Sequence, residues 1–583
     1  MDYIGIITRG SLEKGVEMKL HPDYSIEDVI AGTFVVIEGR DNDFFSMITD
    51  VALDASNPDI LLDPPGEDEG LLLRVLQQSA IYTSVRLKPM LMVPRKAAQP
   101  GATDHSDLLM NDDFATERVR GGRDGALRGK TRGGDAPGPV KTVPAHFSRV
   151  RRASEDDVSR VFGQEKANDS DWFNVGSPID METPVCVDLK KFAERSNGIF
   201  GKSGTGKSFL TRTILCGLIH HRRDIVNLIF DAHNEYGWEA RSEEGNAAKG
   251  LCQIFGKNRV RIYSLDPASS RTRNVGHVEE VRIPLASITP EDVLAMQDEL
   301  NLADAAAESA YLVRNVYRDN WLAVLLEHHD AGLDEGQTLA GRVRANEASL
   351  SALQRKLQSR LMRNGELLPF LTVKPLGQDI LKTMLHDIER GVHIVLEFGG
   401  QQNLLTYLLV SNVLTRRIHA DYVAKYDRWV GAGMPKHAEP RHLMITIEEA
   451  HKFLNPRAAK QTIFGNIARE MRKYGVTLLV VDQRPSGIDD EVMSQIGTRI
   501  TAQLNDEADI ASVLTGVNGA SGLKGVLAQL DSKQQALVMG HSVPMPVMIE
   551  TRDYDAKLWG TMGIADEDTP EGRAKIRELG NAL

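Results

Sequence analysis

Residues 201–208 read Gly201-Lys202-Ser203-Gly204-Thr205-Gly206-Lys207-Ser208, and this stretch decides the fold. It matches G-x-x-x-x-G-K-[ST], the phosphate-binding loop of nucleoside triphosphatases. A short apolar segment, 198–200, precedes it as a strand end, and a helix-like run begins at Phe209. The glycines let backbone N–H groups point at phosphate oxygens, and the helix N-terminus adds partial positive charge. We therefore expect residues 202–209 to bind ATP, with Lys207 at the β- and γ-phosphates and Ser208 on Mg²⁺.

The composition indicates a soluble, multidomain, cytoplasmic protein. The chain has 583 residues, of which 42% are hydrophobic and 26% charged, and no apolar run approaches the ~18 residues of a membrane span. Its N-terminus lacks the charged-then-apolar pattern of a signal peptide, and its three cysteines have no metal-ligand spacing. The net charge of −12 argues against a surface that coats nucleic acid throughout. A locally basic channel is still compatible with this charge, because phosphate contacts need only local positive charge.

The first part of the chain carries short apolar runs typical of β-strands. The runs lie at 4–8, 33–37 and 44–48 and are bounded by Gly, Asp and Asn turns. Residues 84–88 alternate apolar and polar side chains, as a half-buried strand does. Short strands in succession favour a small barrel, which we place in an N-terminal domain at 1–189. Near its end, residues 155–162 predict a short helix and 185–189 a strand that leads into the next domain.

Between Pro100 and Pro139 the composition changes. Glycine is frequent, Phe114 is the only aromatic residue, and basic residues are interleaved with glycine: Arg118, Arg120, Arg123, Arg128, Lys130 and Arg132. Such a segment has little surface to bury, which predicts a disordered basic insertion at about 98–139. The alternative is a basic arm that contacts DNA, although runs of charge are usually only solvated.

The alternation of strands and helices after the phosphate loop predicts an α/β domain at 190–565. Four apolar runs read as buried strands, at 226–230, 392–398, 443–447 and 477–481. Continuous apolar strands belong to a doubly wound parallel sheet with helices on both faces.

Two further features complete this domain. Thr289-Pro290 is a helix start, and the mostly helical sequence after it predicts a helical insertion at about 286–390 with a break near 330–335. The runs 535–539 and 546–549 predict a hairpin, and 566–583 predict a C-terminal tail helix.

Two adjacent acids follow the apolar run 443–447 and point to hydrolysis as well as binding. One acid should hold Mg²⁺ through water, and the other should orient the attacking water. Neighbouring side chains on a strand point in opposite directions, which separates the two roles. We assign Glu448 to magnesium and Glu449 to water. The reverse assignment, or a merely solvated acidic pair, is the alternative.

The segment around the run 477–481 supplies further candidates. Gln483 follows this run and can lie beside the γ-phosphate, where it would sense hydrolysis. Arg469, Arg472 and Lys473 precede the run. One of these arginines can reach the γ-phosphate of a neighbouring subunit, and the alternative is a solvated helix face.

These segments together resemble the HerA-type hexameric DNA translocases, relatives of the FtsK and VirB4 motors. The resemblance covers most of the chain. It rests on the N-terminal barrel, the phosphate loop, Asp231-x-His233-x-Glu235-Tyr236, Glu448-Glu449-Ala450-His451, Arg469-Glu470-x-Arg472-Lys473-Tyr474-Gly475 and Gln483-Arg484-Pro485. It implies a RecA-like ATPase domain with the arginine finger at Arg472 and a second arginine at Arg195. The family commonly has Asp where Glu448 stands, so the charge is kept on a longer arm.

The resemblance also implies partners. The expected assembly is a homohexamer with ATP and Mg²⁺ between subunits and double-stranded DNA in the central channel. The usual partner is a NurA-like nuclease in DNA end processing, and some bacterial relatives instead pair with Sir2-like or other nuclease effectors in phage defence.

We therefore expect an ATP-driven double-stranded DNA translocase. One alternative is a ring-shaped ATPase scaffold that recruits and activates an effector without processive translocation. A conjugation-type motor is a weaker alternative, because such motors usually carry a membrane anchor and this sequence has no run long enough for one.

Overall fold

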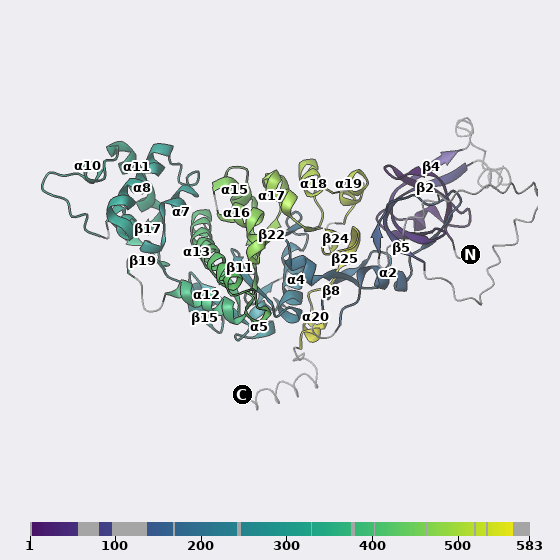
Figure 1. Cartoon of the computed structure of the whole chain (residues 1–583), viewed down its shortest axis with the longest axis horizontal. Coiled ribbons are helices and arrows are strands. Elements are labelled where there is room, and N and C mark those ends of the chain that lie inside the picture. Colours follow the sequence, from purple (N-terminus) through teal and green to yellow (C-terminus); the bar gives the residue numbers. More distant parts are fainter. Residues whose placement is uncertain are drawn as a thin grey trace, which may run out of the picture. The chain divides into compact units, whose positions relative to one another are not determined.

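The chain folds into two compact units, Met1–Ser154 and Glu155–Leu583 (Figure 1). The computed structural model describes residues 3–55, 81–95, 137–166, 170–241, 247–327, 329–374, 379–401, 403–461, 463–517, 520–531 and 534–563. The predicted tail helix and all but residues 137–139 of the predicted basic insertion lie outside these residues. Within them, no helix has the length and apolar character to cross a membrane.

The first unit is a closed antiparallel β-barrel, which confirms the prediction from the short apolar runs. Its strands are β1 (Gly5–Ser11), β2 (Gly15–Leu20), β3 (Phe34–Glu38), β4 (Asn42–Ala55), β5 (Ile81–Pro94) and β7 (Arg149–Arg152). Their order is β2-β1-β7-β3-β4-β5, and β2 pairs with β5 to close the ring. The two-residue strand β6 (Gly138–Pro139) extends the sheet beyond β5.

The barrel interior follows the alternation of side chains along each strand. Val85 and Leu87 of β5 are fully buried, whereas Arg86 between them is exposed and pairs with Asp50. Each apolar side chain of this kind contributes about 1.5–3 kcal/mol when it is fully buried. The sequence did not reveal β7, because only Val150 of its four residues enters the core.

The second unit is built on a sheet of twelve strands. One part is parallel and runs in the order β15 (Val278–Glu280), β14 (Val260–Ser264), β20 (His393–Glu397), β11 (Ile225–Asp231), β21 (His442–Glu448), β22 (Val476–Asp482), β10 (Asn197–Phe200) and β23 (Thr498–Thr501). The other part continues antiparallel through β24 (Gln535–Gly540), β25 (Val547–Thr551), β8 (Trp172–Pro178) and β9 (Val185–Asp188). The predicted hairpin is β24 and β25.

Helices cover the parallel part of the sheet, as fully buried strands require. All seven residues of β11 are buried. Helices that contact these strands include α4 (Lys207–His221), α5 (Leu251–Phe255), α6 (Pro267–Thr272), α12 (Ile380–Arg390) and α16 (Ile463–Glu470) (Figure 1). The long helix α13 (Leu404–Gly431) packs against α16. This arrangement confirms the predicted α/β class.

Two boundaries differ from those predicted. The first unit ends at Ser154 rather than at 189, because β8 and β9 pair with each other and β8 joins β25 of the second sheet. The helical insertion contains α7 (Pro290–Leu294), α8 (Asp304–Tyr317), α9 (Trp321–Leu325), α10 (Leu339–Val343) and α11 (Glu347–Leu361). Helix α12 lies outside this group, because it packs against β20 of the sheet.

Candidate active site

The parallel strands bring their carboxyl ends to one edge of the sheet. Phe200 at the end of β10 lies opposite Asp482 at the end of β22, and Glu448 at the end of β21 lies opposite Val481. The phosphate loop, Gln483 and the two acids therefore meet at this edge, although Ser203 of the loop is 280 residues from Gln483. This is the edge at which open α/β sheets bind ligands.

The phosphate loop has the backbone that a triphosphate requires. Gly204 and Gly206 adopt positive φ angles of 80° and 84°, which only glycine adopts easily. Helix α4 begins directly after Gly206 and has no side-chain cap. Within the described residues, the amides of 203–206 donate no hydrogen bond. A helix N-terminus with free amides is a ready anion site, so the loop fits the phosphates of ATP.

Lys207 begins α4 and points back over the loop. Its Nζ donates to the carbonyl of Lys202 at 2.7 Å, and Thr205 Oγ1 donates to the same carbonyl at 2.8 Å. Burial lowers the pKa of Lys207, although Glu449, Asp482, Glu448 and Glu235 act in the opposite direction. The ammonium group therefore stands among carboxylates at the place where a phosphate would lie.

Gln483 connects the phosphate loop to Glu449. Ser203 Oγ donates to Gln483 Oε1 at 2.8 Å, and Gln483 Nε2 donates to Glu449 Oε1 at 3.2 Å and Oε2 at 3.4 Å. Glu449 has a φ of +50°, a left-handed conformation that a non-glycine residue keeps only when its surroundings impose it. The structure thus brings Gln483 and Glu449, which were predicted to have neighbouring roles, into hydrogen-bond contact.

Glu448 is buried, and one of its two carboxylate oxygens has a hydrogen-bond partner among the described residues. Its side chain accepts a hydrogen bond from Tyr236 Oη at 3.0 Å through Oε1, and Oε2 has no hydrogen-bond partner among the described residues. Burial, with Asp231 and Glu235 nearby, raises the pKa of Glu448 well above its usual range. A buried carboxylate with one free oxygen, close to Lys207 and the loop that carries Ser208, fits a bound cation.

The donors around this carboxylate suit Mg²⁺ better than a metal held only by protein. In the described part of the chain, no cluster of three or more His, Cys, Asp or Glu side chains can enclose a metal ion. Mg²⁺ keeps several of its waters and takes one or two protein oxygens together with phosphate oxygens. Ser208 and Glu448 are a donor set of that size.

The turn after β11 carries Tyr236 to Glu448. The Asp231 carboxylate accepts hydrogen bonds from the amides of Glu235 at 2.7 Å, Tyr236 at 2.8 Å and Gly237 at 3.3 Å. Burial, and then Glu397 on the neighbouring strand, raises the pKa of Asp231 to about 7. The sequence marked the segment 231–236 but gave no role to Tyr236.

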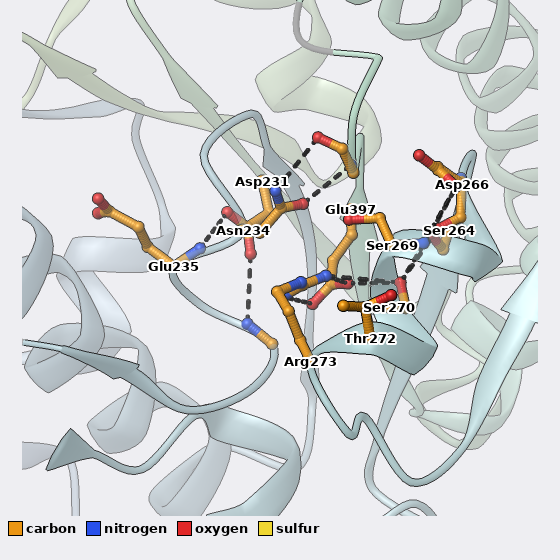
Figure 2. Close-up of polar contacts among 12 residues, drawn as sticks. Asp231, Asn234, Glu235, Ser264, Asp266, Ser269, Ser270, Thr272, Arg273 and Glu397 are labelled. Carbon is orange, nitrogen blue, oxygen red and sulfur yellow. Dashed lines mark hydrogen bonds and ion pairs between the residues drawn. The ribbon is translucent and has the colours of Figure 1, made fainter.

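Beside this turn, Glu397 has partners of its own. Figure 2 shows Glu397 facing Ser270 and Arg273. Ser270 Oγ donates to Glu397 Oε2 at 3.1 Å, and Arg273 forms an ion pair with the same oxygen. The end of β20 is therefore fixed beside the Asp231 turn.

Asp482 joins the turns that follow β21 and β22. It accepts hydrogen bonds from the amides of His451 and Arg484, each at 2.6 Å. The His451 Nδ1 atom lies 3.1 Å from both of its oxygens, and the hydrogen bond to Asp482 raises the pKa of His451. The buried Asp482 carboxylate therefore fixes the turn that carries Glu449 relative to the turn that carries Gln483. No sequence signal marked Asp482, because it reads as the last residue of an apolar strand.

Arg195 and Arg472 lie at the opposite edge of the sheet. Arg195 lies just before β10, separated from it by Ser196, and Arg472 lies in the short 3₁₀ turn η7 (Met471–Tyr474) that precedes β22. Strand β22 has seven residues, which corresponds to roughly 20 Å of extended chain. Both arginines are therefore about a strand length from the phosphate loop of their own chain.

The three candidate arginines differ in their contacts with the rest of the chain. Among the described residues, Arg195 Nε has no hydrogen-bond partner. Arg472 is exposed and acts electrostatically on Glu194. Arg469, the other candidate, donates to the Ala459 carbonyl at 2.9 Å. It is thus committed to its own chain.

Comparisons with known proteins identify relatives of this chain. The family model described as "Helicase HerA, central domain" matches residues 173–418. The chain is 33% identical over 418 residues to the DNA double-strand break repair helicase HerA of Saccharolobus solfataricus, covering 71% of this chain and 74% of the relative. It is also 33% identical over 421 residues to the protein of that name from Pyrococcus furiosus, covering 70% and 73%. The Sulfurisphaera tokodaii protein is 23% identical over 478 residues, covering 78% and 82%.

Proposed function

The chain belongs to the HerA helicase family, and from this premise we propose that it is an ATP-driven translocase of double-stranded DNA that acts as a homohexamer. The observation that carries the proposal is the hydrogen-bonded path from Ser203 through Gln483 to Glu449. This path joins the phosphate loop to an acid that can orient water. A machine that converts ATP hydrolysis into movement needs such a link between the γ-phosphate and a strand end.

The residues at this edge divide the chemistry among them. Lys207 neutralises charge on the β- and γ-phosphates, which requires it to exchange the Lys202 carbonyl for phosphate oxygens. Glu449 orients the attacking water, and Gln483 holds the Glu449 carboxylate in place. Ser208 and Glu448 would hold Mg²⁺, which would supply positive charge to the phosphates.

The two arginines support an assembly in which one copy completes the nucleotide site of the next. Because both arginines precede the strands whose far ends carry the site, each is suited to act on ATP held by an adjacent copy. An arginine supplied in trans stabilises the spread charge of the transferring phosphoryl group. A closed ring gives every site such a neighbour.

The partners are double-stranded DNA and an effector enzyme. With a net charge of −12, the chain can hold DNA only through a local basic surface, such as the lining of a ring. The relatives are named for double-strand break repair. We therefore propose a NurA-like nuclease as the effector, with a Sir2-like or other nuclease of phage defence in the same place as the second candidate.

A translocation assay on the purified full-length protein tests the proposal. ATPase activity is measured with and without linear duplex DNA, and displacement of streptavidin from a biotinylated duplex end reports directional movement. Native mass spectrometry with ATP reports the number of subunits, and Lys207→Ala is the inactive control. We expect six subunits, DNA-stimulated turnover and ATP-dependent displacement. A six-membered ring that hydrolyses ATP without displacing the roadblock would instead support a scaffold that recruits its effector.

A further inference from the structure

Tyr236 is a fully buried side chain with a single polar partner for its hydroxyl group. Its exposed fraction is 0%, and its Oη donates to Glu448 Oε1 at 3.0 Å. A glutamate side chain has three rotatable bonds, so its carboxylate needs restraint before it can face a cation in one orientation. Among the described residues, Tyr236 is the one group that donates to this carboxylate.

Tyr236 is itself rigidly held. Its backbone amide donates to Asp231 Oδ2 at 2.8 Å, within a turn in which Asp231 accepts from two further amides. The carbonyl of Glu235 accepts a hydrogen bond from Arg212 of α4, the helix that begins at the phosphate loop. The phenol therefore stands at a fixed place relative to both β21 and the loop.

A second buried tyrosine provides an internal comparison. Tyr407 of α13 also contacts Glu448, but only its backbone. Tyr407 Oη lies 3.2 Å from both the amide and the carbonyl of Glu448. The two phenols thus share burial and neighbour, and they differ in whether they touch the carboxylate.

We propose that Tyr236 is a positioning residue, which orients the Glu448 carboxylate so that its free oxygen binds Mg²⁺ together with the nucleotide. The proposal rests on the magnesium role of Glu448 in the proposed function. Groups that hydrogen-bond to a metal ligand fix the orientation of that ligand, and their removal typically lowers metal affinity about 10–100-fold. Tyr236 stands in that relation to Glu448.

The test is the Mg²⁺ dependence of ATP binding by Tyr236→Phe. Binding is measured by calorimetry on the full-length protein in a Glu449→Gln background, so that hydrolysis does not interfere. Free Mg²⁺ is varied from micromolar to millimolar at constant ATP. We expect the half-saturating Mg²⁺ concentration to rise at least tenfold, while ATP binding in excess EDTA stays unchanged.

Tyr407→Phe is the matched control, because it removes a hydroxyl of similar burial from the same glutamate. We expect its half-saturating Mg²⁺ concentration to stay within twofold of the parent. Adding Tyr236→Phe to Glu448→Gln should produce no further shift, because the tyrosine acts through that carboxylate. Thermal melting of each variant checks that the fold is intact.

The outcomes separate the proposal from its premise. If Tyr236→Phe leaves the Mg²⁺ requirement unchanged, or if Tyr407→Phe shifts it equally, the positioning role of Tyr236 is wrong while the nucleotide site stands. If the parent itself binds ATP without any dependence on Mg²⁺, or if Glu448→Gln changes nothing, the magnesium role of Glu448 fails and the positioning role fails with it.

Discussion

The two edges of the parallel sheet differ in how far their charged side chains are satisfied within one chain. At the carboxyl edge, Lys207, Gln483 and Glu449 all have hydrogen-bond partners in the same chain. At the amino edge, the guanidinium groups of Arg195 and Arg472 form no ion pair with any described residue. One edge is assembled by the fold alone, whereas the other presents positive charge that the fold leaves free.

This difference indicates where the chain is complete and where it needs a second copy. Desolvating an arginine costs free energy, so a half-buried guanidinium such as that of Arg195 is normally paired. An arginine at the amino edge, away from the nucleotide site of its own chain, is suited to contact the nucleotide of another subunit. Substitutions at the carboxyl edge should therefore have the largest effects on ATP turnover. Substitutions at the amino edge should give the effects most specific to action in trans.

Lys207→Ala should reduce ATP turnover to the background of the assay. Alanine removes the ammonium group that points back over the loop, and among the described residues no other lysine or arginine contacts the same carbonyl. A steady-state ATPase measurement checks this result. Lys382→Ala, which removes an exposed lysine from α12, is the control and should retain full turnover. Turnover within a few-fold of the native protein in Lys207→Ala would remove the basis of the nucleotide site.

Arg472→Ala should lower ATP turnover by about 10³–10⁵-fold, the range in which arginine fingers contribute. The neighbouring exposed residue Lys473 provides the control, and Lys473→Ala should retain activity. Because the residue is predicted to act in trans, Arg472→Ala and Lys207→Ala subunits should partly rescue each other when mixed.

Some interfaces in such mixed rings pair an intact lysine with an intact arginine. Activity should follow the fraction of these interfaces as the mixing ratio changes, or fall below it if the ring requires coordinated firing. Rescue at no ratio, in rings shown by native mass spectrometry to be mixed, would contradict independent action of Arg472 in trans and would direct attention to Arg195.

Glu449→Gln should bind ATP tightly and lower turnover by about 10²–10⁴-fold. Glutamine keeps the shape of the side chain but loses the carboxylate that orients water. Glu448→Gln should instead weaken Mg²⁺-dependent ATP binding, because it removes the negative charge that faces the cation. Filter binding of labelled ATP, compared with turnover, distinguishes the two variants. If Glu448→Gln traps ATP and Glu449→Gln loses it, the two acids have exchanged roles.

The sequence predicted those parts of the fold in which one strand is apolar throughout. The runs 226–230, 443–447 and 477–481 became β11, β21 and β22, each within one or two residues of the predicted bounds. Strand β14 escaped notice because Arg261 interrupts it, and the guanidinium of Arg261 pairs with Asp387 of α12 at 2.8 Å. Polar residues in buried strands depend on partners that are remote in sequence.

The same reason limits what the sequence reveals about the site. The phosphate loop and Glu448-Glu449 are local patterns, because each function requires adjacent residues. Tyr236 and Glu448 are 212 positions apart, and the register of the sheet alone brings them together. The buried arginine of β23 is a further case, since Arg499 donates to the carbonyls of Met493, Val513 and Thr515. Such contacts follow from topology rather than from any spacing of residues.

The smallest expected effect concerns stability at the amino edge, where β20 begins with His393. This side chain is 2% exposed and lies 3.1 Å from the amide of Asn227. Burial lowers the pKa of His393 to about 3, whereas an unfolded histidine has a pKa of about 6.5. Above pH 6.5 both states are neutral, so the stability is fully present. As the pH falls from 6.5 towards 3, only the unfolded state takes up a proton, and stability is lost.

At pH 5 this loss amounts to about 2 kcal/mol. His393→Gln cannot be protonated, so the free energy of unfolding should fall by about 2 kcal/mol less between pH 7 and pH 5 than in the native protein. All five tryptophans lie in the second unit, so urea unfolding followed by tryptophan fluorescence reports on that unit. His386→Gln changes an exposed histidine of α12 and should leave the pH dependence unaltered. Equal pH dependence in His393→Gln and the native protein would mean that the folded amino edge accommodates a charged imidazole. Burial of His393 would then not oppose its protonation.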